Sequence, residues 1–263
     1  MNRARFPADA AKELTIVSTS SRSGVFRRFA FCAVVLALSV TSARAQIAPA
    51  PTLEESLGAE VARFVEADRA APPARCQVLF VGSSSIVRWE TLAADMAPMP
   101  VINRAFGGSH IEYVNRWFDQ IVAPYRPRSI VFYAGENDID AGKSASRVVS
   151  DFDEFMKRKT GALATTPVYF ISLKPSKARF SQFVHQDEVN AAIRSRVATR
   201  SDLHYIDVVS PMLKSGKPRD IFVDDNLHMN AAGYAIWTRA VRKALLPNTE
   251  VEARACRLAS PHP

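Results

Sequence analysis

Short runs of consecutive apolar residues alternate along the chain with longer segments in which apolar residues recur every three or four positions. The run VLFV at residues 78–81 is typical of a strand buried on both faces, whereas the spacing over residues 111–122 is typical of a helix. Strands are predicted on this basis at residues 77–81, 101–106, 129–133, 168–173 and 203–209. Helices are predicted at residues 53–70, 88–96, 111–122, 144–163, 182–199 and 231–246. Buried strands that alternate with helices predict a five-stranded parallel sheet covered on both faces, a three-layer α/β/α sandwich.

The N-terminal segment does not follow this pattern. Basic residues precede an uncharged apolar run at residues 29–40, and small residues ending in the sequence A-R-A at 43–45 follow it. This order is typical of a secretory signal cleaved near Ala45. We therefore expect residues 46–263 to form a single domain that is exported, to the periplasm or the medium, with no stable membrane insertion after cleavage. The alternative is an uncleaved anchor, although the apolar run is short for a membrane span.

Removal of the signal changes the charge of the protein. The whole chain has a formal net charge of +8, but residues 1–45 contain seven Lys or Arg and two Asp or Glu, so the remainder carries +3. The remainder has no basic stripe with interleaved aromatic residues, so no nucleic-acid partner is expected. It also has no H-E-x-x-H motif and no paired Cys/His spacing. We therefore expect neither a metal nor a cofactor.

Two cysteines, Cys76 and Cys256, remain after the predicted cleavage. In an exported protein such a pair can form a disulfide, because the compartment is oxidising. Cys76 precedes the first predicted strand and Cys256 follows the last predicted helix. A bridge would pin the C-terminal tail to the sheet, provided that the two Cα atoms approach within about 7 Å. The sequence leaves this open.

Residues whose side chains or backbone could take part in catalysis or binding follow the predicted strands directly. Gly82-Ser83-Ser84 follows the first strand, Gly107-Gly108 the second, and Gly135-Glu136-Asn137 the third. Asp225 and His228 lie in the long segment 210–230 after the fifth strand. Because ligands bind beyond the carboxyl ends of the strands in sheets of this kind, these residues are candidates for one site. Lys174 follows the fourth strand and could contact a substrate, but a capping or surface role is equally compatible with its position.

Ser84 is the candidate nucleophile. A glycine before a strand-to-helix turn lets the backbone bend and leaves a serine near a helix N-terminus. The competing interpretation is a helix cap formed by Ser83, Ser84 or Ser85, since serine is a common capping residue. The G-x-S-x-G elbow of α/β-hydrolases is not present, because Ile86 occupies its last position.

The remaining candidates would support such a nucleophile. The Gly108 backbone N–H and the Asn137 amide could donate to an oxyanion, although a plain turn and an Asx-turn, respectively, are the structural alternatives. His228 could act as the base if a carboxylate held its far nitrogen. Asp225, three residues earlier, is the candidate for that role, and Asp224 is its rival.

Taken together, these motifs resemble the four blocks of the SGNH hydrolases, also called the GDSL family of lipases and esterases. The blocks match Ser84, Gly108, Asn137 and His228, and the resemblance covers residues 78–245. Ser83 stands where the family name has aspartate, as in a branch with a Gly-Ser-Ser-Ser motif, and Ser83 and Ser85 remain rivals of Ser84.

The resemblance implies a flavodoxin-like sheet and a serine esterase that needs no metal. In it Ser84 would be the nucleophile, His228 the general base and Asp225 its orienting carboxylate. The backbone N–H groups of Ser84 and Gly108 and the amide of Asn137 would form the oxyanion hole. The expected substrate is a small-molecule or polysaccharide ester, and acetyl esters are among the candidates.

Three other functions remain open at this stage. The same site could transfer an acyl group to a sugar hydroxyl, or the fold could be a non-catalytic carbohydrate-binding domain. A nucleotide-binding doubly wound domain is disfavoured, because the chain has neither G-x-G-x-x-G nor a phosphate-binding loop. The sequence does not determine the oligomeric state.

Overall fold

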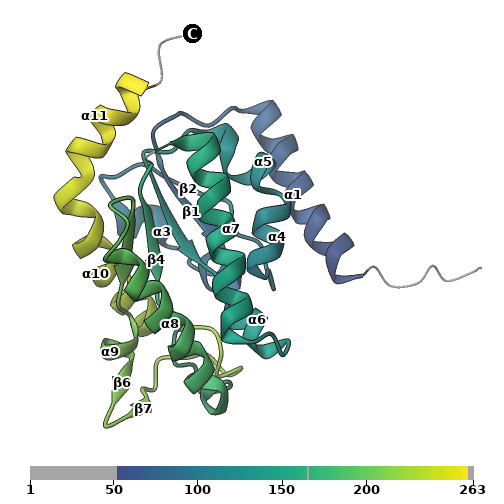
Figure 1. Cartoon of the computed structure of the whole chain (residues 1–263), viewed down its shortest axis with the longest axis vertical. Helices are drawn as coiled ribbons and strands as arrows, with labels where there is room; N and C mark the ends of the chain where they lie inside the picture. Colours follow the sequence, from purple (N-terminus) through teal and green to yellow (C-terminus); the bar gives the residue numbers. More distant parts are fainter. Residues whose placement is uncertain (1–51, 165, 260–263) are drawn as a thin grey trace, which may run out of the picture. The chain divides into compact units, whose positions relative to one another are not determined.

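The computed structural model describes residues 52–164 and 166–259. The predicted signal, residues 1–45, lies outside these ranges. Five parallel strands form the main sheet in the order β2-β1-β3-β4-β5 (Figure 1). The strands are β1 (Val78–Gly82), β2 (Val101–Asn103), β3 (Ser129–Tyr133), β4 (Val168–Ile171) and β5 (Leu203–Ile206). The predicted five-stranded parallel sheet is therefore confirmed.

Helices cover both faces of this sheet, which confirms the three-layer architecture (Figure 1). One layer consists of packed neighbours α1 (Leu53–Ala70), α5 (Phe118–Ile121), α4 (Ile111–Arg116), α7 (Ala145–Leu163) and α8 (Phe183–Val197). On the opposite face α10 (Ala231–Leu245) packs against α3 (Leu92–Met96). None of the helices in the described ranges combines the length and apolar character that crossing a bilayer requires.

Adjacent residues of β3 show how one strand serves both layers. The ring of Phe132 packs against Phe155 of α7, with centroids 4.6 Å apart. The ring of Tyr133, the next residue, packs against Trp237 of α10 at 4.8 Å. Successive side chains of a strand point to opposite faces, so a continuous apolar run is what a sheet between two helical layers requires.

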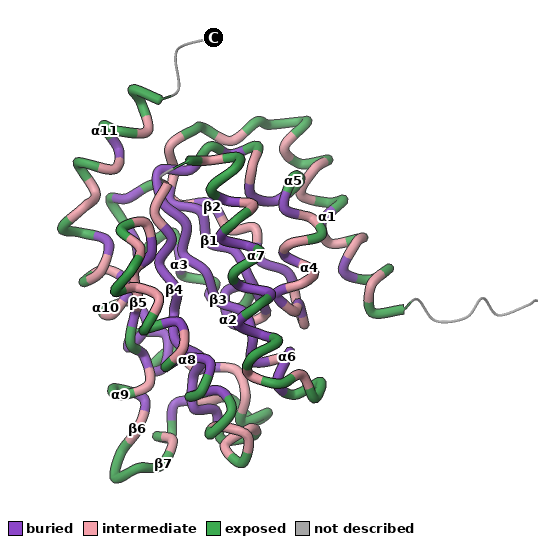
Figure 2. Tube along the Cα trace, in the orientation of Figure 1, coloured by how far each residue is buried: buried purple, intermediate pink, exposed green. Residues whose placement is uncertain are grey.

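Burial follows from the position of each strand in the sheet (Figure 2). Every residue of β1, β3 and β4 is buried, whereas the edge strands β2 and β5 are only partly buried. Three of the longer helices, α1, α7 and α10, begin at side-chain caps that satisfy free backbone N–H groups, whereas α8 has no side-chain cap. Thr52 forms a capping box with Glu55 at α1, Ser144 caps α7, and Asn230 caps α10.

The sheet has a topological switch point between β1 and β3. The chain crosses from β1 to β2 on one side, and then returns to build β3, β4 and β5 on the other. The connections after β1 and β3 therefore diverge, and a crevice at their carboxyl ends is the usual ligand site of such sheets. Gly82 ends β1 there with φ at 137°, and a Cβ atom on it would lie 1.9 Å from the Tyr133 carbonyl oxygen. Only glycine fits this close approach.

Several predicted boundaries were wrong. Strand β2 ends at Asn103 rather than 106, because the Asn103 side chain accepts a hydrogen bond from the Ala105 N–H at 2.9 Å. Strand β5 ends before Asp207, whose carboxylate accepts from the Val209 N–H at 2.9 Å. Such local side-chain bonds turn the chain out of the sheet. The predicted helix 111–122 is divided into α4 and α5 at Trp117.

The pattern did not reveal the short elements or the last helix. These are α2 (Ser84–Val87), η1 (Ala123–Tyr125), α6 (Glu136–Asp140), η2 (Phe180–Gln182), α9 (Val209–Met212), the antiparallel pair β6 (Leu213–Lys214) and β7 (Lys217–Pro218), η3 (Leu246–Asn248) and α11 (Thr249–Ala259). An element of two to five residues is too short to show a period. Helix α11 exposes most of its surface, including Val251 at 71% and Leu258 at 77%.

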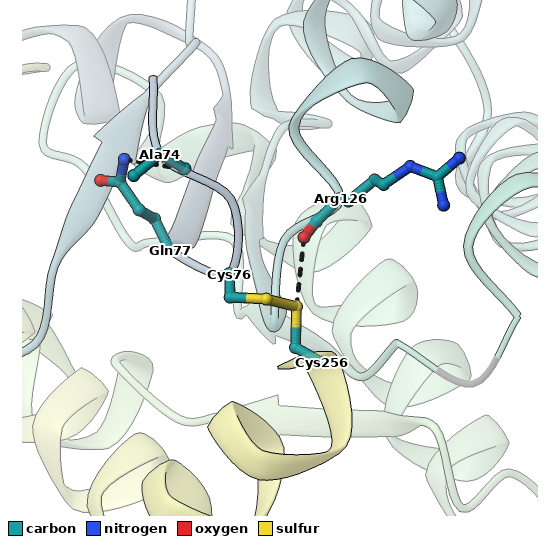
Figure 3. The surroundings of a disulfide bond; sticks show 5 residues. All are labelled: Ala74, Cys76, Gln77, Arg126 and Cys256. Carbon is teal, nitrogen blue, oxygen red and sulfur yellow. Dashed lines mark hydrogen bonds between the residues drawn. A yellow bond between two sulfur atoms is a disulfide. The ribbon is translucent and has the colours of Figure 1, made fainter. Parts of the chain in front are cut away.

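A disulfide bond joins Cys76 to Cys256, with Cα atoms 5.8 Å apart (Figure 3). Cys256 lies within α11 and not in a tail after the last helix, so the bond attaches this helix to the segment that enters β1. The Cys256 Sγ atom also lies 3.3 Å from the Arg126 carbonyl oxygen. Asn248, the last residue of η3 directly before α11, attaches this end of the chain to the sheet as well. Its amide donates to the hydroxyl of Tyr169 in β4 at 3.1 Å.

Candidate active site

Ser84 is the first residue of the short helix α2, directly beyond the carboxyl end of β1. Ser83 occupies the N-cap position, but its side chain makes no capping hydrogen bond. The capping interpretation of this serine cluster is therefore wrong. The close approach of Gly82 to β3 and the turn into α2 leave the Ser84 hydroxyl free to face the loops of the other strands.

His228 contacts Ser84 although 144 residues separate them in the sequence. Its Nε2 atom lies 2.8 Å from Ser84 Oγ, and its Nδ1 atom lies 2.6 Å from Asp225 Oδ2. A carboxylate only accepts hydrogen bonds, so Nδ1 carries the proton and Nε2 presents its lone pair to the serine hydroxyl. Serine, histidine and aspartate thus form one continuous hydrogen-bonded chain.

Asp225 is held by the backbone of its own loop. Its Oδ1 atom accepts from the Leu227 N–H at 2.9 Å and from the His228 N–H at 2.8 Å. Burial raises the pKa of Asp225, but the hydrogen bonds from the His228 ring and from these two N–H groups outweigh it and hold the pKa well below its usual range. The carboxylate is therefore ionised and available to stabilise a positive charge on the ring.

The rival residues lie in other environments. Ser83 and Ser85 are buried, with 3% and 2% exposure, and the hydrogen bond to the His228 ring comes from Ser84. The carboxylate at Nδ1 belongs to Asp225, whereas Asp224 contributes its backbone oxygen to Asn226. The fold therefore brings together Ser84, Asp225 and His228 from the sequence candidates.

The other two candidates, Gly108 on a loop and Asn137 on helix α6, lie on segments held near the end of β1. The Gly82 carbonyl accepts from the Phe106 N–H at 3.0 Å and from Ser109 Oγ at 2.9 Å, which holds the Gly108 loop against the strand. Gly108 adopts φ of 72°, the left-handed region, as expected for a turn glycine. Asn137 is the second residue of α6 and donates from Nδ2 to the Ser109 carbonyl at 3.1 Å.

The sequence did not predict the buried ion pair at Glu136, the residue before Asn137. Lys174, after β4, is fully buried and pairs with Glu136, so neither the surface nor the substrate interpretation of Lys174 holds. Glu136 also accepts from the Tyr133 hydroxyl at 2.7 Å and from Ser176 Oγ at 2.9 Å. Burial raises the pKa of Glu136, but the Lys174 ammonium outweighs it and keeps the pKa below its usual range. No sequence motif pairs residues 38 positions apart, so only the fold could reveal this contact.

Arg179 is a further residue that sequence reasoning missed. It follows Lys174 on the loop after β4 and donates from Nη1 to Asn137 Oδ1 at 2.9 Å.

Within residues 52–164 and 166–259, no group of three His, Cys, Asp or Glu side chains is arranged to hold a metal ion.

Comparisons with solved structures identify the fold. A GDSL-like lipase from Bacteroides thetaiotaomicron superposes with a TM-score of 0.60 at 16% identity, covering 71% of this chain and 97% of its own. A mutant acetyl esterase with an acetate ion gives 0.56 at 16% identity, covering 67% and 99%. A carbohydrate esterase family 3 protein from Talaromyces cellulolyticus gives 0.56 at 15% identity, covering 66% and 98%. A search of curated proteins gave no match.

The sequence itself matches a family model. The model of the GDSL-like lipase/acylhydrolase family covers residues 60–236, more than half of the chain. This range includes Ser84, Gly108, Asn137, Asp225 and His228. The chain therefore belongs to the GDSL-like lipase/acylhydrolase family and is an ester-hydrolysing enzyme.

Proposed function

We propose that the protein hydrolyses carboxylic esters, acetyl esters among them, through an acyl-enzyme on Ser84. The observation that carries this proposal is the hydrogen-bonded chain from Ser84 Oγ to His228 at 2.8 Å and on to Asp225 at 2.6 Å. These are the distances at which a base can take the proton of a nucleophile while a carboxylate orients the base.

In the acylation step Ser84 Oγ attacks the ester carbonyl carbon, and its proton passes to His228 Nε2. Collapse of the tetrahedral intermediate breaks the bond to the alcohol oxygen, which takes that proton from Nε2. A water molecule then attacks the acyl-enzyme and gives a proton to Nε2. When the second intermediate collapses, the carboxylic acid leaves and the proton returns to Ser84 Oγ. Asp225 stabilises the imidazolium that forms in both halves.

The proposed oxyanion hole consists of three donors. They are the backbone N–H groups of Ser84 and Gly108 and the side-chain amide of Asn137. The Ser84 N–H lies at a helix start, where a backbone donor has no partner within its helix. Asn137 has a second amide N–H beyond the one bonded to Ser109. Loss of one such donor typically lowers kcat by about 10²–10³-fold.

The proposed substrates are small-molecule or polysaccharide esters with short acyl groups. Two similar structures support this choice, since one is an acetyl esterase and the other a carbohydrate esterase.

We further propose that the domain, residues 46–263, is exported after cleavage of the signal at residues 1–45. Polysaccharide esters are accessible to an exported enzyme. The sequence pattern of that signal is the support for this location.

The test is the Ser84→Ala variant, assayed with p-nitrophenyl esters of increasing chain length. We expect kcat to fall by at least about 10⁴-fold while the melting temperature stays the same, because the residue is a nucleophile and not part of the core. The matched control is Ser150→Ala, at an exposed serine of α7. A serine-reactive phosphonate should label the wild type once, at Ser84. Undiminished activity in Ser84→Ala would overturn the proposal, and acetylated sugar in place of free acetate would identify a transferase.

A further inference from the structure

We propose that Arg179 is a positioning residue, which fixes the orientation of the Asn137 side-chain amide so that an N–H, and not the oxygen, faces the reacting carbonyl. The inference rests on the proposed function, in which Asn137 donates to the oxyanion. It assigns a role to a residue that lies on the loop after β4, outside the four sequence motifs.

The two ends of the Asn137 amide have contacts of opposite polarity. Nδ2 donates to the Ser109 carbonyl at 3.1 Å, and Oδ1 accepts from Arg179 Nη1 at 2.9 Å. Rotation of the amide by 180° would set its oxygen against the Ser109 carbonyl and its NH₂ group against the guanidinium. Both new contacts would be repulsive, since a guanidinium only donates and a carbonyl only accepts. The two partners together therefore permit a single orientation.

Arg179 is itself held in place. Its Nη2 atom donates to Asp140 Oδ2 at 2.8 Å, and Gln182 donates to the other oxygen of Asp140 at 3.0 Å. Asn137 and Asp140 are three residues apart on α6 and share a face of this helix. The planar fork of the guanidinium spans both of them, a geometry that a lysine ammonium cannot reproduce. The Arg179 side chain is only 14% exposed, which limits competition from water.

The loop that carries Arg179 is anchored on both sides. At its start, the buried ion pair between Lys174 and Glu136 attaches the loop to the first residue of α6. On its other side, the Ala178 N–H donates to the Asn226 carbonyl at 2.9 Å, within the loop that carries Asp225 and His228. Arg179 therefore lies on a segment that is bonded both to the proposed oxyanion donor, Asn137, and to the loop that carries the proposed base.

The charge on Arg179 also affects the donor strength of Asn137. A hydrogen bond from an ionised donor is about twice as strong as a neutral one and polarises its acceptor. Electron density drawn toward Oδ1 leaves the amide N–H groups more acidic, and so better donors to an oxyanion. This benefit is largest in the transition state, when negative charge has developed on the substrate oxygen.

A double-mutant cycle tests the inference with p-nitrophenyl acetate as the substrate. Arg179→Met is expected to lower kcat by about 10- to 100-fold, the effect of losing a hydrogen bond to a charged group, with little change in KM. In the Asn137→Ala background the same substitution is expected to change kcat by less than about twofold, because the group through which it acts is gone.

Two further variants keep the test specific. Arg179→Lys retains a cation but not the fork, so its kcat is expected between those of the wild type and Arg179→Met. The cycle can be run with this milder variant if Arg179→Met does not fold. The matched control is Arg196→Met, which breaks a two-bond pair with Asp153 at the far end of α8 and should leave kcat unchanged.

The outcomes separate the inference from the proposal beneath it. If Asn137→Ala alone retains the wild-type kcat, the proposed oxyanion role fails. If Asn137→Ala lowers kcat but Arg179→Met does not, or if the two losses multiply, the positioning role is overturned and the oxyanion role stands. An Arg196→Met variant as impaired as Arg179→Met would also overturn it, because the loss would then not be specific to the site.

Discussion

Removal of the disulfide between Cys76 and Cys256 is expected to lower the free energy of unfolding strongly and to leave catalysis unchanged. The bond closes a loop across a sequence separation of 180 residues, nearly the whole described domain. A cross-link of this kind restricts the unfolded chain far more than the folded one, so its loss favours unfolding.

The magnitude follows from the length of the loop. With a separation of 180 residues, the loop-entropy relation gives about 5 kcal/mol at 25 °C. For a domain of roughly 200 residues this corresponds to a decrease in Tm of about 10 to 20 °C. Helix α11 buries only Ala253 and has few other attachments, one being the bond that Glu252 accepts from the Tyr169 hydroxyl, so it should detach first.

The assay compares the oxidised wild type with the Cys76→Ser/Cys256→Ser variant in guanidinium chloride. Trp89 and Trp237 are 1% and 0% exposed, so their fluorescence reports the loss of the core. Reductant should lower the stability of the wild type to that of the variant and leave the variant unaffected. Peptide mapping should recover a cross-linked peptide that contains both cysteines and excludes Cys32.

The kinetic constants serve as a control, because the disulfide and the active site lie at opposite ends of β1. Cys76 precedes β1 and Ser84 follows it, so the bond and the site are separated by about 20 Å of extended chain. The kinetic constants of the variant at 25 °C should therefore equal those of the wild type. Equal unfolding free energies for the two proteins, or two free thiols at these positions in the oxidised wild type, would refute the reasoning.

Two further predictions concern buried charges. Lys174→Met should destabilise the fold by about 3–5 kcal/mol in denaturant titrations, because it leaves the buried Glu136 carboxylate without its nearest cation and with only Arg179 Nη1, 3.9 Å away. Adding Glu136→Gln should restore most of this loss, and an unaltered single variant would contradict the argument. Burial raises the pKa of Asp202, but Arg200 and Lys159 outweigh it and lower the pKa to about 2. Since the folded pKa lies below the unfolded value, this carboxylate contributes about 2 kcal/mol above roughly pH 4, and the contribution is lost as the pH falls toward 2. The difference in unfolding free energy between the wild type and Asp202→Asn should shrink over that range, whereas a constant difference would refute the assignment.

Local order along the chain was sufficient to predict the strands, most of the long helices and the segments after the strands that carry Ser84, Gly108, Asn137 and His228. Apolar runs and helical spacing depend only on neighbouring residues, and the carboxyl ends of parallel strands must share one edge of the sheet. Boundaries failed where a side chain competed with the backbone, as Asn103 does after β2. Helix α11 escaped prediction because it packs little apolar surface onto the core.

The sequence by itself determined the fold class and the set of candidate residues. The family resemblance already favoured Ser84 and Asp225, but only the tertiary structure separated them from the rivals Ser83, Ser85 and Asp224, since this depends on which atoms reach the His228 ring. The disulfide and the contact of Arg179 with Asn137 likewise depend on separations of 180 and 42 residues. Contacts over such separations leave no periodic pattern in the sequence, because they are created by the packing of whole strands and helices.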